Sequence, residues 1–106
     1  MMKKLIFRVR KEYFNMLKSG EKTIEYRKDS AFWQKRVWLD LSPEKQAALN
    51  LTEDPWQAVF LCGQQVHRRE IVRIERTKTP TDFSAQGKKD VPTPTCIAFF
   101  LGHSLD

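Results

Sequence analysis

Apolar residues near the N-terminus recur first at every second position and then at every third or fourth. Leu5 and Phe7 alternate with outward positions that include two arginines, which is the period of a strand with one buried face. We therefore predict a strand at residues 4–9. Between residues 11 and 19 the apolar side chains share one face of a helix about two turns long. Gly20 follows where a glycine typically ends a helix, and so short a helix must dock on the sheet to be stable.

Four further strands are predicted by apolar residues that alternate or run together. A continuous apolar run at residues 58–62 is typical of a central strand that is covered on both faces. After a turn at residues 64–67, alternation points Val72 and Ile74 inward and predicts an antiparallel partner strand. The four predicted strands are residues 22–28, 58–62, 69–77 and 97–101, the last of which is ended by Gly102.

Two segments between the predicted strands have no strand period. Residues 42–50 predict a second, peripheral helix, since a serine can cap it and a proline follows at its first position. Residues 78–95 contain three prolines and one glycine, which predicts a long loop with at most one helical turn. Loops of this length are often functional. This one is either a lid that presents Phe83, Lys88 and Lys89 to a cleft or a plain connection.

These elements define the expected fold class and size. With 106 residues and 41% apolar content, the chain has enough apolar surface for one core, so we expect a single domain at residues 1–106. About five strands, one docked helix and one peripheral helix, without a βαβ repeat, predict an α+β fold, a small mixed β-barrel. The sequence has no apolar run that could span a bilayer and no signal-peptide pattern, so we expect a cytoplasmic protein that is not bound to a membrane.

The charge of the chain is concentrated near its N-terminus. The net charge is +6, and residues 1–38 alone contain eleven Lys or Arg against four acids, which gives +7. A basic face attracts phosphates through a salt-sensitive release of counterions. Many small soluble proteins are equally basic without binding nucleic acid, so charge alone leaves this question open.

The turn after Gly20 brings acidic and basic residues together. Side chains alternate along a strand, so Glu25 and Arg27 share one face, while Ile24 and Tyr26 share the other, which we expect to be buried. Lys22 lies just before them. We expect the lysine, the carboxylate and the guanidinium to meet in an exposed cleft, where each can orient the others. The alternative is a solvated strand edge with ordinary charges.

Aromatic residues alternate with basic residues in the next segment. Phe32, Trp33 and Trp38 flank Lys35 and Arg36. Such aromatics can stack on bases, at roughly 1 to 3 kcal/mol per base, while the cations hold phosphate. The alternative is that both tryptophans pack in the core, as most tryptophans do.

The first third of the chain also resembles a known family. Tyr13-Phe14, the run Leu17-Lys18-Ser19-Gly20-Glu21-Lys22-Thr23, then Glu25-Tyr26-Arg27 and Phe32-Trp33-Gln34-Lys35-Arg36 are similar to the signature of the ASCH domain. Beyond residue 36 the match is loose. The resemblance implies a PUA-like β-barrel with this turn at the mouth of its cleft. It also implies an RNA or nucleotide-like ligand, with hydrolysis in some branches.

A hydrolase is the alternative that this resemblance raises. Branches that hydrolyse acylated cytidine use a lysine in this turn, a threonine in the following strand and a glutamate farther along. Lys22 matches the lysine, but Glu25 occupies the threonine position. A small hydrolase acting on RNA or an acylated nucleoside would therefore use Lys22 and Glu25 as an acid–base pair. The adjacent carboxylate favours a charged lysine, which suits phosphate binding better than proton abstraction.

We expect neither a metal nor a cofactor, because His67 and His103 lie far apart and neither is near a cysteine at zinc-finger spacing. Three functions remain: a module that binds RNA or a nucleotide, a small metal-independent hydrolase, and a domain that binds an acidic protein partner. In the first, Lys22 and Arg27 contact phosphate or a base edge and Glu25 orients them. The candidate ligand-binding residues are Lys22, Glu25, Tyr26, Arg27, Trp33, Lys35 and Arg36.

Overall fold

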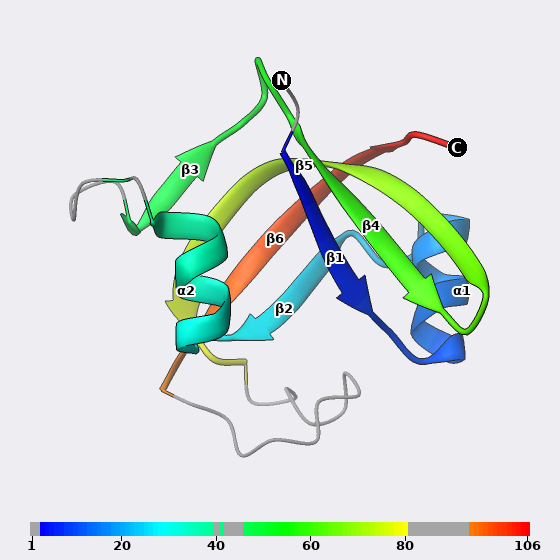
Figure 1. Ribbon diagram of the computed structural model, residues 1–106, viewed down its shortest axis with the longest axis horizontal. Coiled ribbons are helices and arrows are strands. Elements are labelled where there is room, and N and C mark those ends of the chain that lie inside the picture. Colours follow the sequence, from blue (N-terminus) through cyan, green and yellow to red (C-terminus); the bar gives the residue numbers. More distant parts are fainter. Residues whose placement is uncertain (1–2, 40, 42–45, 81–93) are drawn as a thin grey trace.

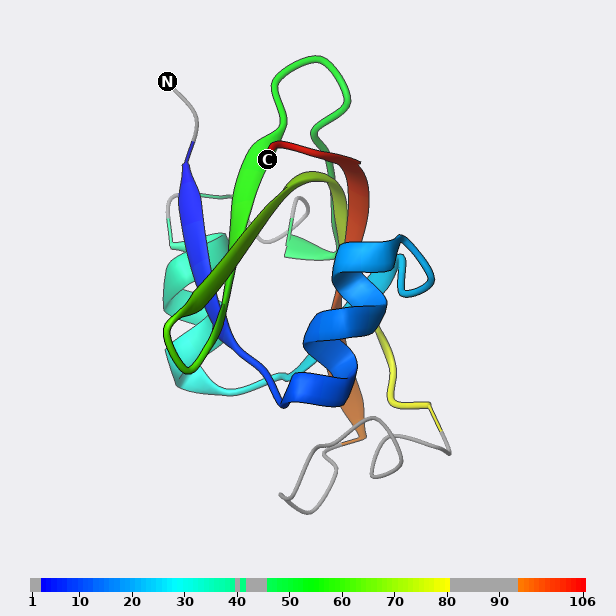
Figure 2. The ribbon, with the colours of Figure 1, turned by 90° about the vertical axis from the view of Figure 1, so that its right-hand side faces the viewer.

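The computed structural model describes residues 3–39, 41, 46–80 and 94–106. This part of the chain forms two helices and a mixed sheet that curls into a half-barrel, as Figure 1 and Figure 2 show, and it confirms the predicted α+β barrel-like fold. In chain order the elements are β1 (Lys4–Arg8), α1 (Lys11–Ser19), β2 (Ile24–Lys28), α2 (Ala31–Trp38), β3 (Ala48–Asn50), β4 (Trp56–Cys62), β5 (Gln65–Lys78) and β6 (Thr95–Ser104).

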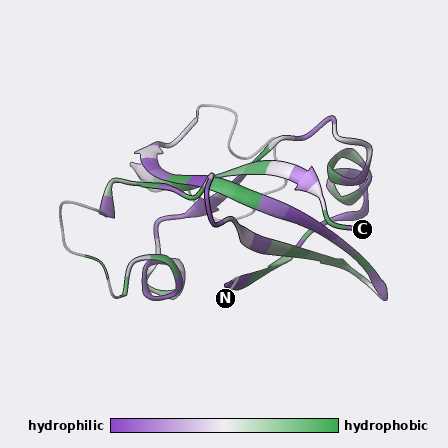
Figure 3. Ribbon diagram, turned by 90° about the horizontal axis from the view of Figure 1, so that it is seen from above, coloured by the Kyte–Doolittle hydropathy of each residue, from purple (hydrophilic) through white to green (hydrophobic). Residues whose placement is uncertain are grey.

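The sheet runs in the order β1-β4-β5-β6-β2, and β3 pairs with β5 beside this path. The pairing of β1 with β4 is parallel, and the other pairings are antiparallel. β1 and β2 therefore lie at the two ends of the path. Seen from above (Figure 3), the two helices lie at opposite ends of the molecule.

Aromatic rings fill the concave side of the sheet. Phe7 from β1 stacks on Trp33 from α2, with 5.0 Å between ring centroids, and on Phe60 from β4, at 5.2 Å. Phe99 from β6 meets Phe7 edge-on at 5.0 Å. Such offset and edge-on arrangements add to the stabilisation that the burial of the rings already provides. These rings thus join β1, β4 and β6 to α2.

The helix α1 begins and ends where the periodicity predicts. It buries Phe14 and Leu17 and packs on β4 and β5. Gly20 has a φ of 87°, and its N–H donates a hydrogen bond of 3.3 Å to the Leu17 carbonyl. This left-handed residue turns the chain from α1 toward β2.

Replacing Gly20 with alanine should lower the free energy of unfolding by about 1 to 2 kcal/mol, because a side chain disfavours the left-handed conformation. A Cβ atom at Gly20 would have no neighbour within 4 Å, so the cost should be confined to the backbone. Urea denaturation of Gly20→Ala beside Lys18→Ala, an exposed change in the same helix, would measure it. Equal midpoints for the two variants would contradict the prediction.

The second helix does not lie where the sequence predicted it. It is α2, whereas residues 48–50 of the predicted helix 42–50 form β3. Residues 42–45 lie outside the described part. The helix α2 forms because Trp33, Val37 and Trp38 lie on one helical face, and all three are buried. The helix prediction at 42–50 rested on capping residues without such an apolar stripe.

The hairpin between β4 and β5 also differs from the prediction in its turn. β5 begins at Gln65, so the turn consists of Gly63 and Gln64 instead of residues 64–67. Gly63 has a φ of 60°, the conformation that two-residue hairpin turns require. The continuous apolar strand and its antiparallel partner are confirmed.

Two further corrections concern β5 and β6. In β5 the buried pair is Ile71 and Ile74, while Val72 is only half-buried, because the register with β6 shifts between Arg69 and Arg73. Gly102 lies inside β6 and does not end it. A Cβ atom there would lie 2.9 Å from Val72 Cγ1, so this position requires glycine for space.

Of the predicted loop at residues 78–95, residues 81–93 lie outside the described part. That segment includes the predicted helical turn and the three residues proposed for a lid. At the described ends, the Thr79 N–H donates a 3.1 Å hydrogen bond to the Pro94 carbonyl. None of the described helices has the length and apolar character that a membrane span would need.

Candidate anion-binding cleft

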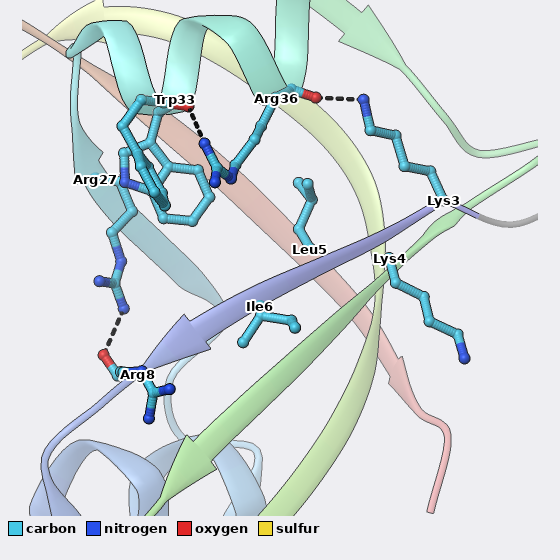
Figure 4. A pocket seen from close by; sticks show the side chains of 9 residues that line it. Lys3, Lys4, Leu5, Ile6, Arg8, Arg27, Trp33 and Arg36 are labelled. Atoms are coloured by element: carbon cyan, nitrogen blue, oxygen red, sulfur yellow. Dashed lines mark hydrogen bonds between the residues drawn. The ribbon is translucent and has the colours of Figure 1, made fainter.

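A basic cleft lies along the free side of β1, facing α2 (Figure 4), and has a volume of about 450 Å³. Five of its nine lining residues are lysine or arginine, and none of the nine is acidic. An unbalanced set of cations in a concavity raises the local concentration of anions. The lining residues are Lys3, Lys4, Leu5, Ile6, Arg8, Arg27, Phe32, Trp33 and Arg36.

One wall of the cleft is the strand β1. Its alternation buries Leu5 toward the core, while Lys4, Ile6 and Arg8 are exposed. The Lys3 ammonium donates a hydrogen bond to the main-chain carbonyl of Arg36 in α2, which joins the start of this wall to the helix. The exposed cations of β1 therefore lie beside the opening.

The opposite wall is the helix α2. Trp33 is only 7% exposed and forms part of the floor, whereas Phe32 is 53% exposed at the rim. The Arg36 guanidinium lies 3.4 Å from the centroid of the Phe32 ring and donates a 2.8 Å hydrogen bond to the Phe32 carbonyl. This pair presents a flat cationic and aromatic surface at the mouth of the cleft.

Asp29 anchors α2 to the sheet. Its carboxylate accepts hydrogen bonds from Gln34 in α2 (2.8 Å) and from Thr95 in β6 (2.7 Å), and it pairs with Arg76 of β5 at 3.0 Å. Burial raises the pKa of Asp29, but these hydrogen bonds and the charge of Arg76 outweigh it and lower the pKa below its ordinary value. The wall formed by α2 is thus held in place by a charged group.

Behind the cleft, the three charged residues of the predicted turn do come together. Lys22 Nζ lies 3.2 Å from Glu25 Oε1, and Arg27 contacts Glu25 Oε2 through Nε at 2.9 Å and Nη2 at 2.7 Å. Glu25 is only 1% exposed, Lys22 9% and Arg27 17%. The structure therefore brings the triad together, but it buries Lys22 and Glu25 away from the lining of the cleft.

The burial of the two faces of β2 is the reverse of the prediction. Glu25 faces the interior, whereas Ile24 and Tyr26, on the other face, are only half-buried. The carboxylate can be buried because two cations compensate its charge. The Arg27 guanidinium in turn lies over the rings of Phe7 and Trp33, at 5.3 and 5.7 Å from their centroids.

The other candidate residues lie in three places. Trp33 and Arg36 line the cleft together with Arg27. Tyr26 lies on the opposite face of β2 from Arg27. Lys35 is exposed and borders other hollows, beside Leu39, so the structure separates it from the basic cleft.

Sequence reasoning missed Lys3, Lys4 and Arg8 as cleft residues. The alternation of β1 already placed Lys4 and Arg8 on its outward face. Their position opposite α2 depends on the parallel pairing of β1 with β4 and on a helix that was not predicted. Besides that alternation, the signal for them was the excess of basic residues among the first 38.

Arg69 is a buried residue that supports the turn. Its guanidinium donates to the carbonyl of Lys22 at 2.6 Å, to that of Leu17 at 3.4 Å, and twice to that of Gly102, at 3.1 and 2.9 Å. Burial lowers the pKa of Arg69 below its ordinary value. Arg69 thus ties the end of α1 and the approach to β2 onto β6, which sets the position of the charged triad.

Within residues 3–39, 41, 46–80 and 94–106, no group of three His, Cys, Asp or Glu side chains is arranged to hold a metal ion. The comparisons with known proteins give no relative: no family model, no curated protein and no solved structure matches this chain.

Proposed function

We propose that the protein binds RNA or a nucleotide-like ligand in the cleft between β1 and α2. The observation that carries the proposal is the lining of the cleft, in which five cations and no acid surround an exposed aromatic ring. The resemblance to the ASCH domain implies the same class of ligand. The volume of about 450 Å³ falls within the range of about 300 to 1,000 Å³ that is usual for small-ligand sites.

The proposed roles follow from the exposure of each side chain and from the contacts that fix it. Lys4 and Arg8 are exposed and extend from β1, so they bind phosphate. Phe32, with Arg36 against its ring, offers a surface on which a base can stack. Arg27 is fixed by Glu25, while its Nη1 makes no hydrogen bond within the described residues and can donate to the ligand.

Lys22 takes a different role from the one expected from the sequence. Because it is buried and paired with Glu25, it neutralises that carboxylate and does not contact the ligand. The hydrolase alternative has less support for the same reason: neither member of the proposed acid–base pair lines the cleft. A catalytic pair must lie within hydrogen-bond reach of the reacting group.

Replacing both Lys4 and Arg8 with alanine should weaken the binding of single-stranded RNA by at least about tenfold. The slope of log affinity against log salt concentration should also fall, by the equivalent of about two phosphate contacts. Fluorescence anisotropy with labelled pentauridine, measured over a range of salt concentrations, would show both effects. The matched control is Lys11→Ala with Lys18→Ala, which removes two exposed cations from α1, outside the cleft. Equal losses in both double variants, or no binding by the wild-type protein, would contradict the proposed function.

A further inference from the structure

Some main-chain N–H and C=O groups of β1 point toward the cleft and have no partner strand. Toward β4, the Lys3 carbonyl accepts a 2.7 Å hydrogen bond from the Gln57 N–H, and the Val9 N–H donates one of 3.0 Å to the Leu61 carbonyl. In a parallel pair each strand bonds its neighbour through alternate residues. The main-chain N–H and C=O groups of the odd-numbered residues of β1 therefore point toward β4. Those of Lys4, Ile6 and Arg8 point toward the open side of the strand.

A hydrogen bond from Arg27 shows that the Arg8 carbonyl points to the open side of β1, and it marks one end of the unpaired stretch. The Arg27 Nη2 donates this 3.0 Å hydrogen bond to the Arg8 carbonyl across the gap between β1 and β2 (Figure 4). At the other end, the Lys3 ammonium bonds to the Arg36 carbonyl. Between these two bridges, the main-chain groups of Lys4 and Ile6 make no hydrogen bond on this side within the described part of the chain.

We propose that this open edge of β1 reads the hydrogen-bonding edge of an unpaired nucleobase, with the N–H and C=O of Ile6 as the central donor and acceptor. The inference rests on the proposed function. A strand residue presents its N–H and C=O side by side, and a base presents a neighbouring acceptor and donor on its Watson–Crick edge. The base enters between β1 and the ring of Phe32, with phosphates bound by Lys4 and Arg8.

A peptide that added to β1 as a further strand would use the same groups. That occupant fits the cleft less well, because the bridges from Lys3 and Arg27 leave only the stretch from Lys4 to Ile6 open. Strands in globular proteins usually have about five to six residues. A single base needs only one donor and one acceptor, so the short open edge favours it.

The Watson–Crick edge is accessible only when a base is unpaired. We therefore expect labelled pentauridine, pentaadenosine or pentacytidine to bind at least about tenfold more tightly than a short RNA duplex at the same salt concentration. Equal affinity for strand and duplex would overturn the inference, since phosphate contacts alone do not distinguish them in this way. It would leave the proposed function intact.

Ile6→Pro tests the main-chain contact directly. Proline removes the N–H on the open side and leaves the hydrogen bonds to β4 in place, which is why edge strands tolerate it. The matched variant Ile6→Ala loses the side chain but keeps the N–H. We expect Ile6→Pro to bind pentauridine at least about tenfold more weakly than Ile6→Ala, with the same salt dependence because the phosphate contacts remain.

Amide hydrogen exchange on the wild-type protein supplies a test that needs no substitution. Adding pentauridine should slow exchange at the amide of Ile6, while the amides of Leu5 and Phe7, which face β4, stay protected with or without RNA. Unchanged exchange at Ile6 with bound RNA would overturn the inference but not the proposed function. Binding of an acidic peptide in place of RNA, lost in Ile6→Pro, would overturn both and assign the edge to strand addition.

Discussion

Replacing Glu25 with alanine is expected to lower the free energy of unfolding by about 3 to 5 kcal/mol, the usual cost of removing one partner from a buried ion pair. Glu25 is the acid that Lys22 and Arg27 share, and all three side chains are largely buried. Without it, two cations would remain close together and only partly solvated. Urea denaturation of Glu25→Ala would measure the loss.

The matched control is Glu21→Ala, which removes an exposed acid from the same turn. Surface substitutions of this kind usually change stability by no more than about 0.5 kcal/mol. RNA affinity measured on folded Glu25→Ala should also fall, because the Arg27 guanidinium loses the acceptor that fixes it at the cleft. A stability loss no larger than that of Glu21→Ala would show that the triad contributes little to the fold.

Replacing Arg69 with alanine is expected to cost about 3 kcal/mol or more, because buried carbonyls left without a donor cost about 1 to 3 kcal/mol each. From a position that is 6% exposed, Arg69 donates to the carbonyls of Lys22 and Gly102. It also donates to the Leu17 carbonyl, which would keep the Gly20 N–H as a donor. The thermal unfolding midpoint and the urea midpoint should both fall.

Arg73→Ala is the appropriate comparison for Arg69→Ala. Arg73 lies on the same strand and pairs with Glu75 at the surface. Exposed pairs of this type contribute about 0.2 to 1 kcal/mol, so this variant should remain close to the wild type. Similar midpoints for the two arginine variants would mean that water replaces the Arg69 guanidinium at little cost.

The parts of the fold that depend on local periodicity could be predicted from the sequence. The strand at Leu5 and Phe7 and the helix ended by Gly20 follow from neighbouring residues alone. The tryptophans Trp33 and Trp38 do pack in the core, as one of the two alternatives held, but α2 was missed because no helical period was assigned to their segment. The inward pair of β5 was misassigned because a register shift against β6, a feature of pairing between distant segments, changes the alternation there.

In the candidate site, too, only the features that depend on neighbouring residues could be predicted from the sequence. The alternation of β2 places Glu25 and Arg27 on one face, Lys22 lies just before the strand, and the structure does bring the three together. Their burial was not predictable, since it depends on rings supplied by Phe7 and Trp33 from other elements. The basic wall of β1 likewise depends on a distant partner strand.

The parallel pairing of β1 has a consequence for the order of assembly. Lys4 lies opposite Gln57, so the pairing of β1 with β4 has to close a long loop, whereas β4 and β5 are joined by a two-residue turn. Closing so long a loop is entropically costlier and slower than forming a hairpin. We expect the hairpin to form early and the N-terminal strand to join it late. The ability to capture an anion would then appear only once folding is complete.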